Sequence, residues 1–247
     1  MKKQILIIMS MFILLGCEED EPIVAGNSNT LKIEFKQYYK NQLISIQNDN
    51  TLNYINSSSN EYNVKSLKYY ISKLMIERDN GTLYDVDMYK LINAAESDTY
   101  NTFTLTDIPE GRYTQLHFIF GIDSARNVLQ GLPNNSETNS MEWPVNLGAG
   151  YHFMMMEGVF KRSDNSLSGY AIHLGRTPNQ YKAEFGIDLT VSNTSAQVIE
   201  VQMNVDQWFD GFNKIDLNNG YSYIMEDSLK QLQFKQNATS VFSIVQK

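Results

Sequence analysis

Alternation of apolar and polar residues with a period of two most restricts the fold of this 247-residue chain. Leu31, Ile33 and Phe35 alternate with charged residues, as in a strand with one buried face. The same reasoning predicts strands at 43–46, 67–76, 83–92, 103–105, 113–122, 151–161, 170–174, 184–191, 198–205 and 238–245. Asn80-Gly81 and Pro109-Glu110-Gly111 predict tight turns. Short strands with frequent turns predict an all-β fold with minor helix, a single-domain antiparallel β-sandwich.

Three segments interrupt this pattern. Residues 123–150 are rich in Asn, Ser, Gly and Pro and predict a long irregular loop, which in compact domains is usually functional or disordered. Asp206 to Phe212 predicts a short helix capped by Asp206, and Ser222 to Gln233 predicts a second one.

The N-terminal residues predict an export signal. Lys2 and Lys3 precede an apolar run that ends in Leu14-Leu15-Gly16-Cys17, too short for a good membrane span. Cys17 is the only cysteine of the chain, and this ending resembles a bacterial lipoprotein signal. Residues 1–16 are therefore predicted to be the signal peptide, with Cys17 as the lipidated first residue of the mature protein. The alternative is an ordinary cleaved signal with an incidental cysteine.

Residues 17–29 predict an acidic flexible tether, and residues 30–247 the folded domain. Glu18-Glu19-Asp20-Glu21 is similar to the surface-export signal of lipoproteins in the Bacteroidetes lineage, although a simple spacer explains the run equally well. The expected location is the cell envelope, with the protein lipid-anchored to the outer membrane and either periplasmic or surface-exposed.

Charge and motifs limit the function further. Removal of Lys2 and Lys3 changes the formal charge from −8 to −10, which argues against nucleic acid as a partner. The sequence contains no His-Glu-x-x-His, Cys-x-x-Cys, Walker or Gly-x-Ser-x-Gly motif, so no enzymatic activity is expected. A glycosidase-type pair of acids stays open as a lower-ranked alternative, because sequence alone does not give the spacing of two carboxylates.

A few side chains are candidates for metal chemistry. Met154-Met155-Met156 contains thioethers, which suit Cu(I), but alternation places Met155 on one face and the other two on the opposite face, as adaptable core residues. His173 is expected to face away from Ile172 and Leu174, where a lone histidine is more often structural than functional. Trp143 is either an anchor of the long loop or a binding residue.

An ordered set of segments resembles the MbnP-like family, the methanobactin-operon-associated copper-binding proteins. The segments are Leu67–Ser72, Gly121–Asn127, Met141-Glu142-Trp143, Gly150–Phe153, Glu157-Gly158, Ile172–Gly175 and Asn237–Phe242. The resemblance implies an exported β-rich protein that binds or handles copper beside a di-heme peroxidase-like partner. In some members a tryptophan oxidised to kynurenine joins histidines around the metal. By this match His173 is a candidate copper ligand, and Trp143 is one only if it is oxidised to kynurenine.

The match is incomplete at two positions. Val128 stands where copper-binding members often have a histidine, and Val145 stands at a second tryptophan position. His152 lies nearby and is a further candidate ligand, although the family pattern does not mark it. These departures leave an alternative open, a metal-free surface binding or interaction module on the same scaffold.

Overall fold

The computed structural model describes residues 29–192 and 196–247. The predicted signal peptide, Cys17 and nearly all of the predicted tether lie outside the described residues. A five-stranded sheet contains β13 (Phe242–Gln246), β12 (Gln197–Asn204), β1 (Leu31–Tyr39) and β2 (Gln42–Leu43) in that order, with β7 (Thr102–Leu105) also paired to β1. The alternation that predicted β1 is present, with Leu31, Ile33 and Phe35 all buried.

An eight-stranded sheet forms the second layer. Its main path is β11 (Tyr181–Val191), β8 (Gly111–Phe120), β5 (Ser66–Arg78), β9 (His152–Lys161), β4 (Glu61–Tyr62) and β3 (Tyr54–Ile55). In addition, β10 (Leu167–Gly175) pairs with β9, and β6 (Leu83–Asn93) pairs with β5. Asn80-Gly81 makes the expected turn between β5 and β6, where Gly81 adopts a φ of +84°.

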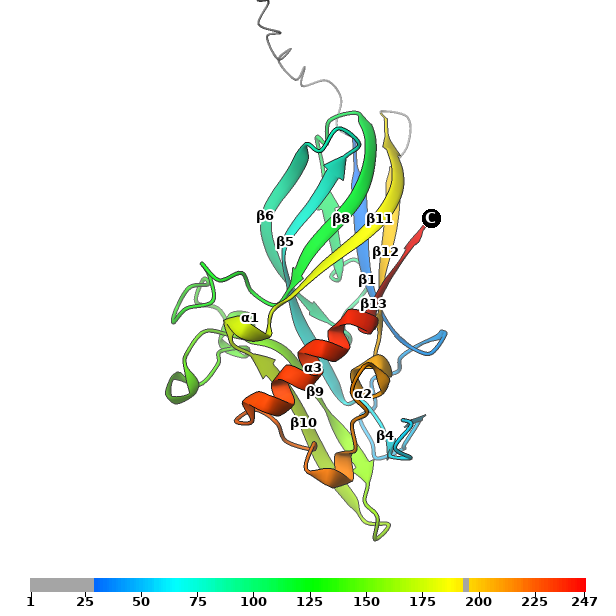
Figure 1. Ribbon diagram of the computed structural model, residues 1–247, viewed down its shortest axis with the longest axis vertical. Helices are drawn as coiled ribbons and strands as arrows, with labels where there is room; N and C mark the ends of the chain where they lie inside the picture. Colours follow the sequence, from blue (N-terminus) through cyan, green and yellow to red (C-terminus); the bar gives the residue numbers. More distant parts are fainter. Residues whose placement is uncertain (1–28, 193–195) are drawn as a thin grey trace, which may run out of the picture.

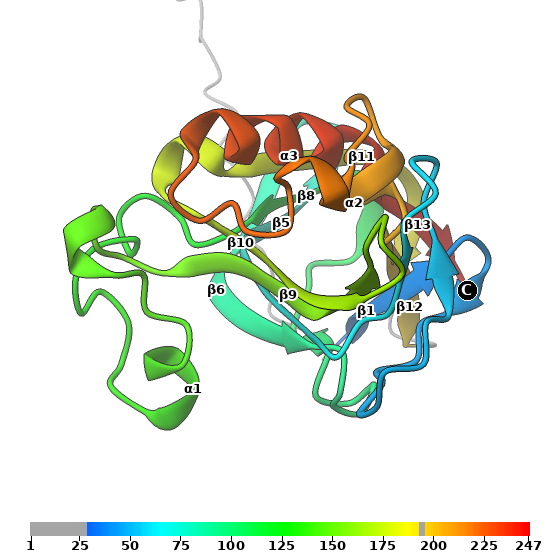
Figure 2. The same ribbon diagram turned by 90° about the horizontal axis from the view of Figure 1, so that it is seen from below.

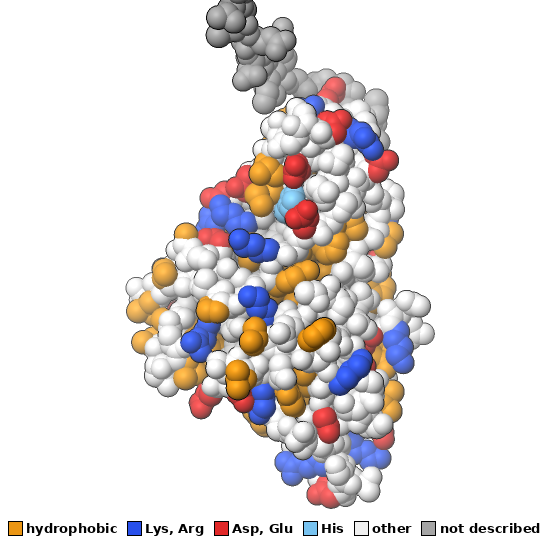
Figure 3. Space-filling model, in the orientation of Figure 1, with side chains coloured by type: hydrophobic (Ala, Val, Ile, Leu, Met, Phe, Trp, Pro, Cys, Tyr) orange, Lys and Arg blue, Asp and Glu red, His pale blue; other side chains and the backbone are white. Residues whose placement is uncertain are grey.

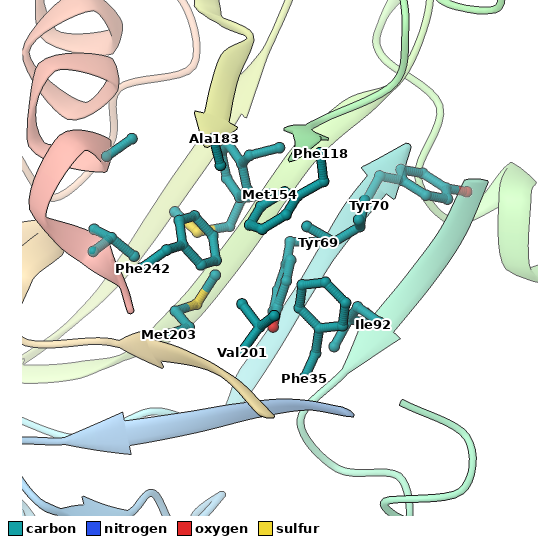
Figure 4. Close-up of a cluster of buried hydrophobic side chains, with 14 of the residues drawn as sticks. Phe35, Tyr69, Tyr70, Ile92, Phe118, Met154, Ala183, Val201, Met203 and Phe242 are labelled. Carbon is teal, nitrogen blue, oxygen red and sulfur yellow. The ribbon is translucent and has the colours of Figure 1, made fainter. Parts of the chain in front are cut away.

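The two sheets pack face to face over an aromatic core (Figure 4). Phe35 of the five-stranded sheet meets Phe118 of the eight-stranded sheet edge-on, with ring centroids 5.5 Å apart. Phe242 and Phe120 make a similar contact across the layers at 5.7 Å. Tilted and edge-on ring pairs of this kind add stability beyond the area that they bury. The predicted all-β antiparallel sandwich is therefore confirmed.

One strand pairing departs from the antiparallel rule. β1 and β12 run parallel, in register from Leu31 opposite Gln197 to Tyr38 opposite Asn204. The two strands lie far apart in the sequence, so no hairpin signal indicated their relative direction.

β5 connects two parts of the larger sheet. Its first residues pair with β9 and its later residues pair with β8, so that β9 and β10 diverge from β8 and β11 along one edge of β5. Figure 1 shows the β9–β10 hairpin at the lower end of the molecule and β6, β8 and β11 at the upper end. The candidate site lies where the two parts separate, at the beginning of β9.

Helices occupy one side of the sandwich, where α2 (Gln207–Asp210) and α3 (Ser228–Val241) contact each other (Figures 1 and 2). α2 agrees with the helix predicted at 206–212, although the Asp206 side chain makes no capping hydrogen bond, and α3 overlaps the second predicted helix. The strand predicted at 238–245 is wrong in its first half, because α3 continues to Val241 and β13 begins at Phe242. Ala238 and Val241 repeat the helical spacing of buried Phe234, which decides the helix.

The remaining short elements are α1 (Ser136–Asn139) and three 3-10 turns, η1 (Val145–Leu147), η2 (Thr177–Asn179) and η3 (Leu217–Asn219). Among residues 29–192 and 196–247, no helix has the length and apolar character needed to cross a membrane.

Candidate functional site

The segment 123–150 is an ordered loop that delivers Trp143 to the sheet. It projects to one side of the molecule (Figure 2) and includes α1 and η1. Its return is fixed by a β-bridge between Glu142 and Tyr151. The Trp143 amide donates to the carbonyl of Gly150 at 2.8 Å, and the His152 amide donates to the carbonyl of Met141 at 2.7 Å. The bridge therefore holds Trp143 beside the first residues of β9.

Asn127 fastens the same loop from the other side. Its Oδ1 accepts from the Tyr151 amide at 2.9 Å, and its Nδ2 donates to Oγ1 of Thr177 at 3.2 Å. Gly150 has a φ of +94°, and a Cβ there would collide with the Asn127 side chain, so this turn requires glycine. Asn127 and Gly150, which carried part of the family resemblance, thus act by shaping the loop.

Trp143 is buried against the end of β10. Only 2% of the residue is exposed, and its indole lies on Gly175 at the end of β10. A Cβ on Gly175 would overlap the six-membered ring, with Cζ3 at 2.6 Å. The indole Nε1–H donates to the carbonyl of Leu147 in η1 at 3.2 Å. Glycine is therefore needed at the end of β10 to admit the ring.

A β-bulge brings His152 and His173 together. Simple alternation would place His152 on the buried face with Met154 and Met156. The register of β9 and β10 shifts by one residue, however, because Leu174 pairs with Met154 while Gly175 pairs with His152. Beyond this shift the His152 and His173 ring centroids lie 5.0 Å apart, almost perpendicular to each other. Bulges that redirect a side chain in this way are common next to functional sites.

His152 is a buried, neutral imidazole with a free nitrogen. Its Nδ1 lies 3.2 Å from the carbonyl of Met141, which only accepts, so Nδ1 carries the proton. Nε2 is buried and has no hydrogen-bond partner among the described residues. Burial, together with the nearby His173, lowers the pKa of His152 from 6.5 to about 4. The Nε2 lone pair is therefore available at neutral pH.

His173 is oriented by a carboxylate. Its Nε2 lies 2.7 Å from Oε1 of Glu157, which is diagonally across the strand pair on β9. The hydrogen bond to His173 lowers the pKa of Glu157, so the carboxylate is ionised and Nε2 of His173 donates to it. In the neutral tautomer this leaves Nδ1 of His173 as the free donor atom. Carboxylate–histidine pairs of this kind orient metal ligands in many proteins.

The structure brings the three predicted site residues into one cluster. The rings of Trp143 and His152 lie 4.8 Å apart, and His152 contacts His173 in turn. The third histidine, His117, lies on β8 with Glu77 at 3.1 Å and Glu184 at 3.8 Å, so it has other partners. Val128 and Val145 are 50% and 66% exposed, and neither side chain supplies a metal donor.

Two residues of the cluster were not identified as site residues from the sequence, namely Glu157 and Gly175. The signal for Glu157 was present, since pairing 151–161 with 170–174 as a hairpin places Glu157 on the His173 face. Nothing in the sequence indicated that Gly175 contacts the indole of Trp143. The bulge at His152 had no sequence signal either.

The donor set fits copper in part. Two imidazole nitrogens are free, and imidazole suits copper in either oxidation state. Within residues 29–192 and 196–247, no group of three or more His, Cys, Asp or Glu side chains is placed to hold a metal ion. The unmodified indole of Trp143 donates a hydrogen and has no lone pair for a metal. A complete site would therefore need a donor besides the two histidines.

Comparison with known proteins identifies the family. The sequence profile of the MbnP family matches residues 28–226. No curated protein sequence matches the chain. Among solved structures, MbnP from Methylosinus trichosporium is similar with a TM-score of 0.57 and 13% identity, over 90% of this chain and 99% of that one. At this identity the structural likeness shows the shared fold, whereas the profile match covers most of the sequence. The chain belongs to the MbnP family.

Proposed function

We propose that this protein is a lipid-anchored protein of the cell envelope that binds or handles copper. The observation that carries the proposal is the contact of His152 with His173 beside Trp143, with Nε2 of His152 buried and, within 29–192 and 196–247, unpartnered. A buried polar atom without a partner costs free energy, so such atoms call for a ligand or another explanation. The family membership adds a resemblance to copper-handling proteins.

The residues have distinct roles in this proposal. Nε2 of His152 and Nδ1 of His173 would bind the metal, and the contacts to Met141 and Glu157 fix their tautomers. Bound copper would supply either a stored ion for delivery or a redox centre. Trp143 would join as a donor only after oxidation to kynurenine, a change that needs an external oxidant such as the di-heme peroxidase-like partner that the resemblance implies.

The proposal is for binding at a membrane, not for catalysis or nucleic-acid recognition. Lipid on Cys17 would hold the domain at the outer membrane, facing either the periplasm or the outside. On the face drawn in Figure 3, acidic and basic side chains are interspersed, without the broad basic area that phosphate binding uses.

Copper titration of matched histidine variants tests the proposal. The wild-type protein should retain copper after dialysis, and His173→Ala and His152→Asn should each weaken binding at least about tenfold. His117→Ala is the control, because that histidine lies on β8 with other partners. Equal and negligible retention by all four proteins would refute copper binding.

A metal-free surface module is the second candidate function. Val128 and Val145 favour it, because both are exposed apolar side chains at positions where copper-binding relatives are expected to carry histidine or tryptophan. Peptide mass spectrometry of the Trp143 segment from copper-replete native cells discriminates between the two. A tryptophan-to-kynurenine mass change supports the copper site, and unmodified tryptophan supports the surface module.

A further inference from the structure

One methionine shares the face of the sheet that carries His173. Met155 pairs directly with His173 across β9 and β10, and directly paired residues of antiparallel strands point to the same face. The contact between His173 and Glu157 confirms this orientation, since Glu157 lies two residues from Met155 on the same strand. The side chains of Met155 and His173 are therefore neighbours.

The other two methionines of the run are excluded from this face. Met154 and Met156 are fully buried, and Figure 4 shows Met154 inside the aromatic core between the sheets. Met155 is only partly buried. The three methionines thus divide as one on the face of the candidate site and two in the core.

The position of Met155 matches the donor that the site lacks. Two imidazoles lie together there, and no third His, Cys, Asp or Glu in the described part of the chain completes the set. Thioether sulfur is a soft donor that favours Cu(I), and the three rotatable bonds of methionine let it move without a change in the backbone. Lys68 flanks Met155 on β5, and its positive charge interacts with Glu157.

We propose that Met155 is a copper ligand and that, with His152 and His173, it makes the site selective for Cu(I) over Cu(II). The inference rests on the proposed copper-binding function and specifies it. Nitrogen donors alone accept both oxidation states, whereas a thioether selects the softer ion. Placement of Met155 directly opposite His173 therefore assigns the cargo as cuprous ion, without any requirement that Trp143 be modified.

Competition against a coloured Cu(I) chelator, with ascorbate as reductant, tests this assignment on the purified protein. Met155→Leu keeps the volume and removes the sulfur, and Met156→Leu is the matched control in the core. We expect Met155→Leu to weaken Cu(I) binding about tenfold. Its Cu(II) affinity and thermal midpoint should stay close to wild type, and Met156→Leu should bind Cu(I) as wild type does.

X-ray absorption at the copper edge gives a second readout. The wild-type Cu(I) complex should show a sulfur scatterer that Met155→Leu lacks. If Met155→Leu binds Cu(I) like wild type while His173→Ala does not, the thioether assignment is wrong and the histidine site stands. If neither His173→Ala nor Met155→Leu differs from a wild type that binds no copper, the proposed function fails as well.

Discussion

At the scale of single residues, packing alone does not explain His152. Its ring is held between Trp143 and His173, and one nitrogen is satisfied by the carbonyl of Met141. The other nitrogen is buried without a partner in the described part of the chain, which costs roughly 1–3 kcal/mol in a folded protein. If no ligand bound this nitrogen, an apolar residue at position 152 would avoid the cost.

The depressed pKa of His152 predicts acid sensitivity of the metal-free protein. Because its pKa falls from 6.5 to about 4 on folding, the unfolded chain binds more protons between these values. Stability should therefore decrease as the pH falls from 6.5 to 4, by up to about 3 kcal/mol. His173 and Glu157 face the ring, and the lowered pKa of Glu157 adds a loss only below its ordinary value of 4.5.

His152→Asn isolates this effect, because Asn keeps a short side-chain donor and does not titrate. Urea unfolding of metal-free wild type and variant at several pH values measures the difference. The wild-type curve should be the steeper of the two between pH 6.5 and 4. Parallel curves would show that another group causes the acid sensitivity.

Gly175 gives a second prediction at this scale, because a methyl group there would overlap the Trp143 ring. Gly175→Ala should destabilise the protein by about 1–3 kcal/mol and change the tryptophan fluorescence, since the indole must move. Gly186→Ala is the control, because a Cβ at Gly186 meets nothing within 4 Å. Chemical denaturation measures both. Equal stability of the two variants would mean that the residues around the indole adjust to the added methyl group without cost.

At the scale of elements, period-two alternation predicted most strands, because each strand has one face in the core. It also placed His173 and Met155 correctly on the outward faces of β10 and β9. It gave no signal for the bulge at His152, because a one-residue bulge changes the face of a side chain and no residue type marks it. It wrongly predicted a strand at 238–241, because buried polar residues such as Asn237 and Gln231 interrupt the apolar face of α3.

Gln231 shows how α3 supports the site. Its fully buried side chain accepts from Nδ2 of Asn179 at 2.9 Å and from the Gly175 amide at 3.3 Å, and it donates to the carbonyl of Met225 at 2.6 Å. The helix thereby holds the end of β10, on which the Trp143 indole rests.

Gln231→Leu should therefore destabilise the protein by about 1–3 kcal/mol, because it leaves buried donors without an acceptor. The tryptophan fluorescence should change together with the stability, since the seat of the indole loosens. Leu229→Ala, on the exposed side of the same helix, should stay within about 0.5 kcal/mol of wild type. Urea midpoints compare the three proteins. A Gln231→Leu midpoint equal to that of wild type would remove α3 from the support of the site.

At the scale of the whole molecule, the candidate site lies away from the end at which the described chain begins. Leu31 pairs with Leu105 at the end of the sandwich that also holds the Asn80-Gly81 turn, where Tyr84 donates to the carbonyl of Thr106. Met155 and its neighbours pair with the opposite end of β5. The histidine cluster therefore lies away from the end of the domain to which an N-terminal anchor would be joined.

This separation predicts that anchoring and copper binding are independent. Cys17→Ser should move the protein from the membrane fraction to the soluble fraction, because the lipid has no other attachment residue. Its copper affinity should equal that of wild type, since the proposed ligands are far along the chain. His173→Ala should show the reverse, with membrane association kept and copper affinity lost. Fractionation of cells followed by copper titration measures both properties. A soluble, copper-binding wild type would contradict the anchor, and loss of copper by Cys17→Ser would show that the two ends of the molecule are coupled.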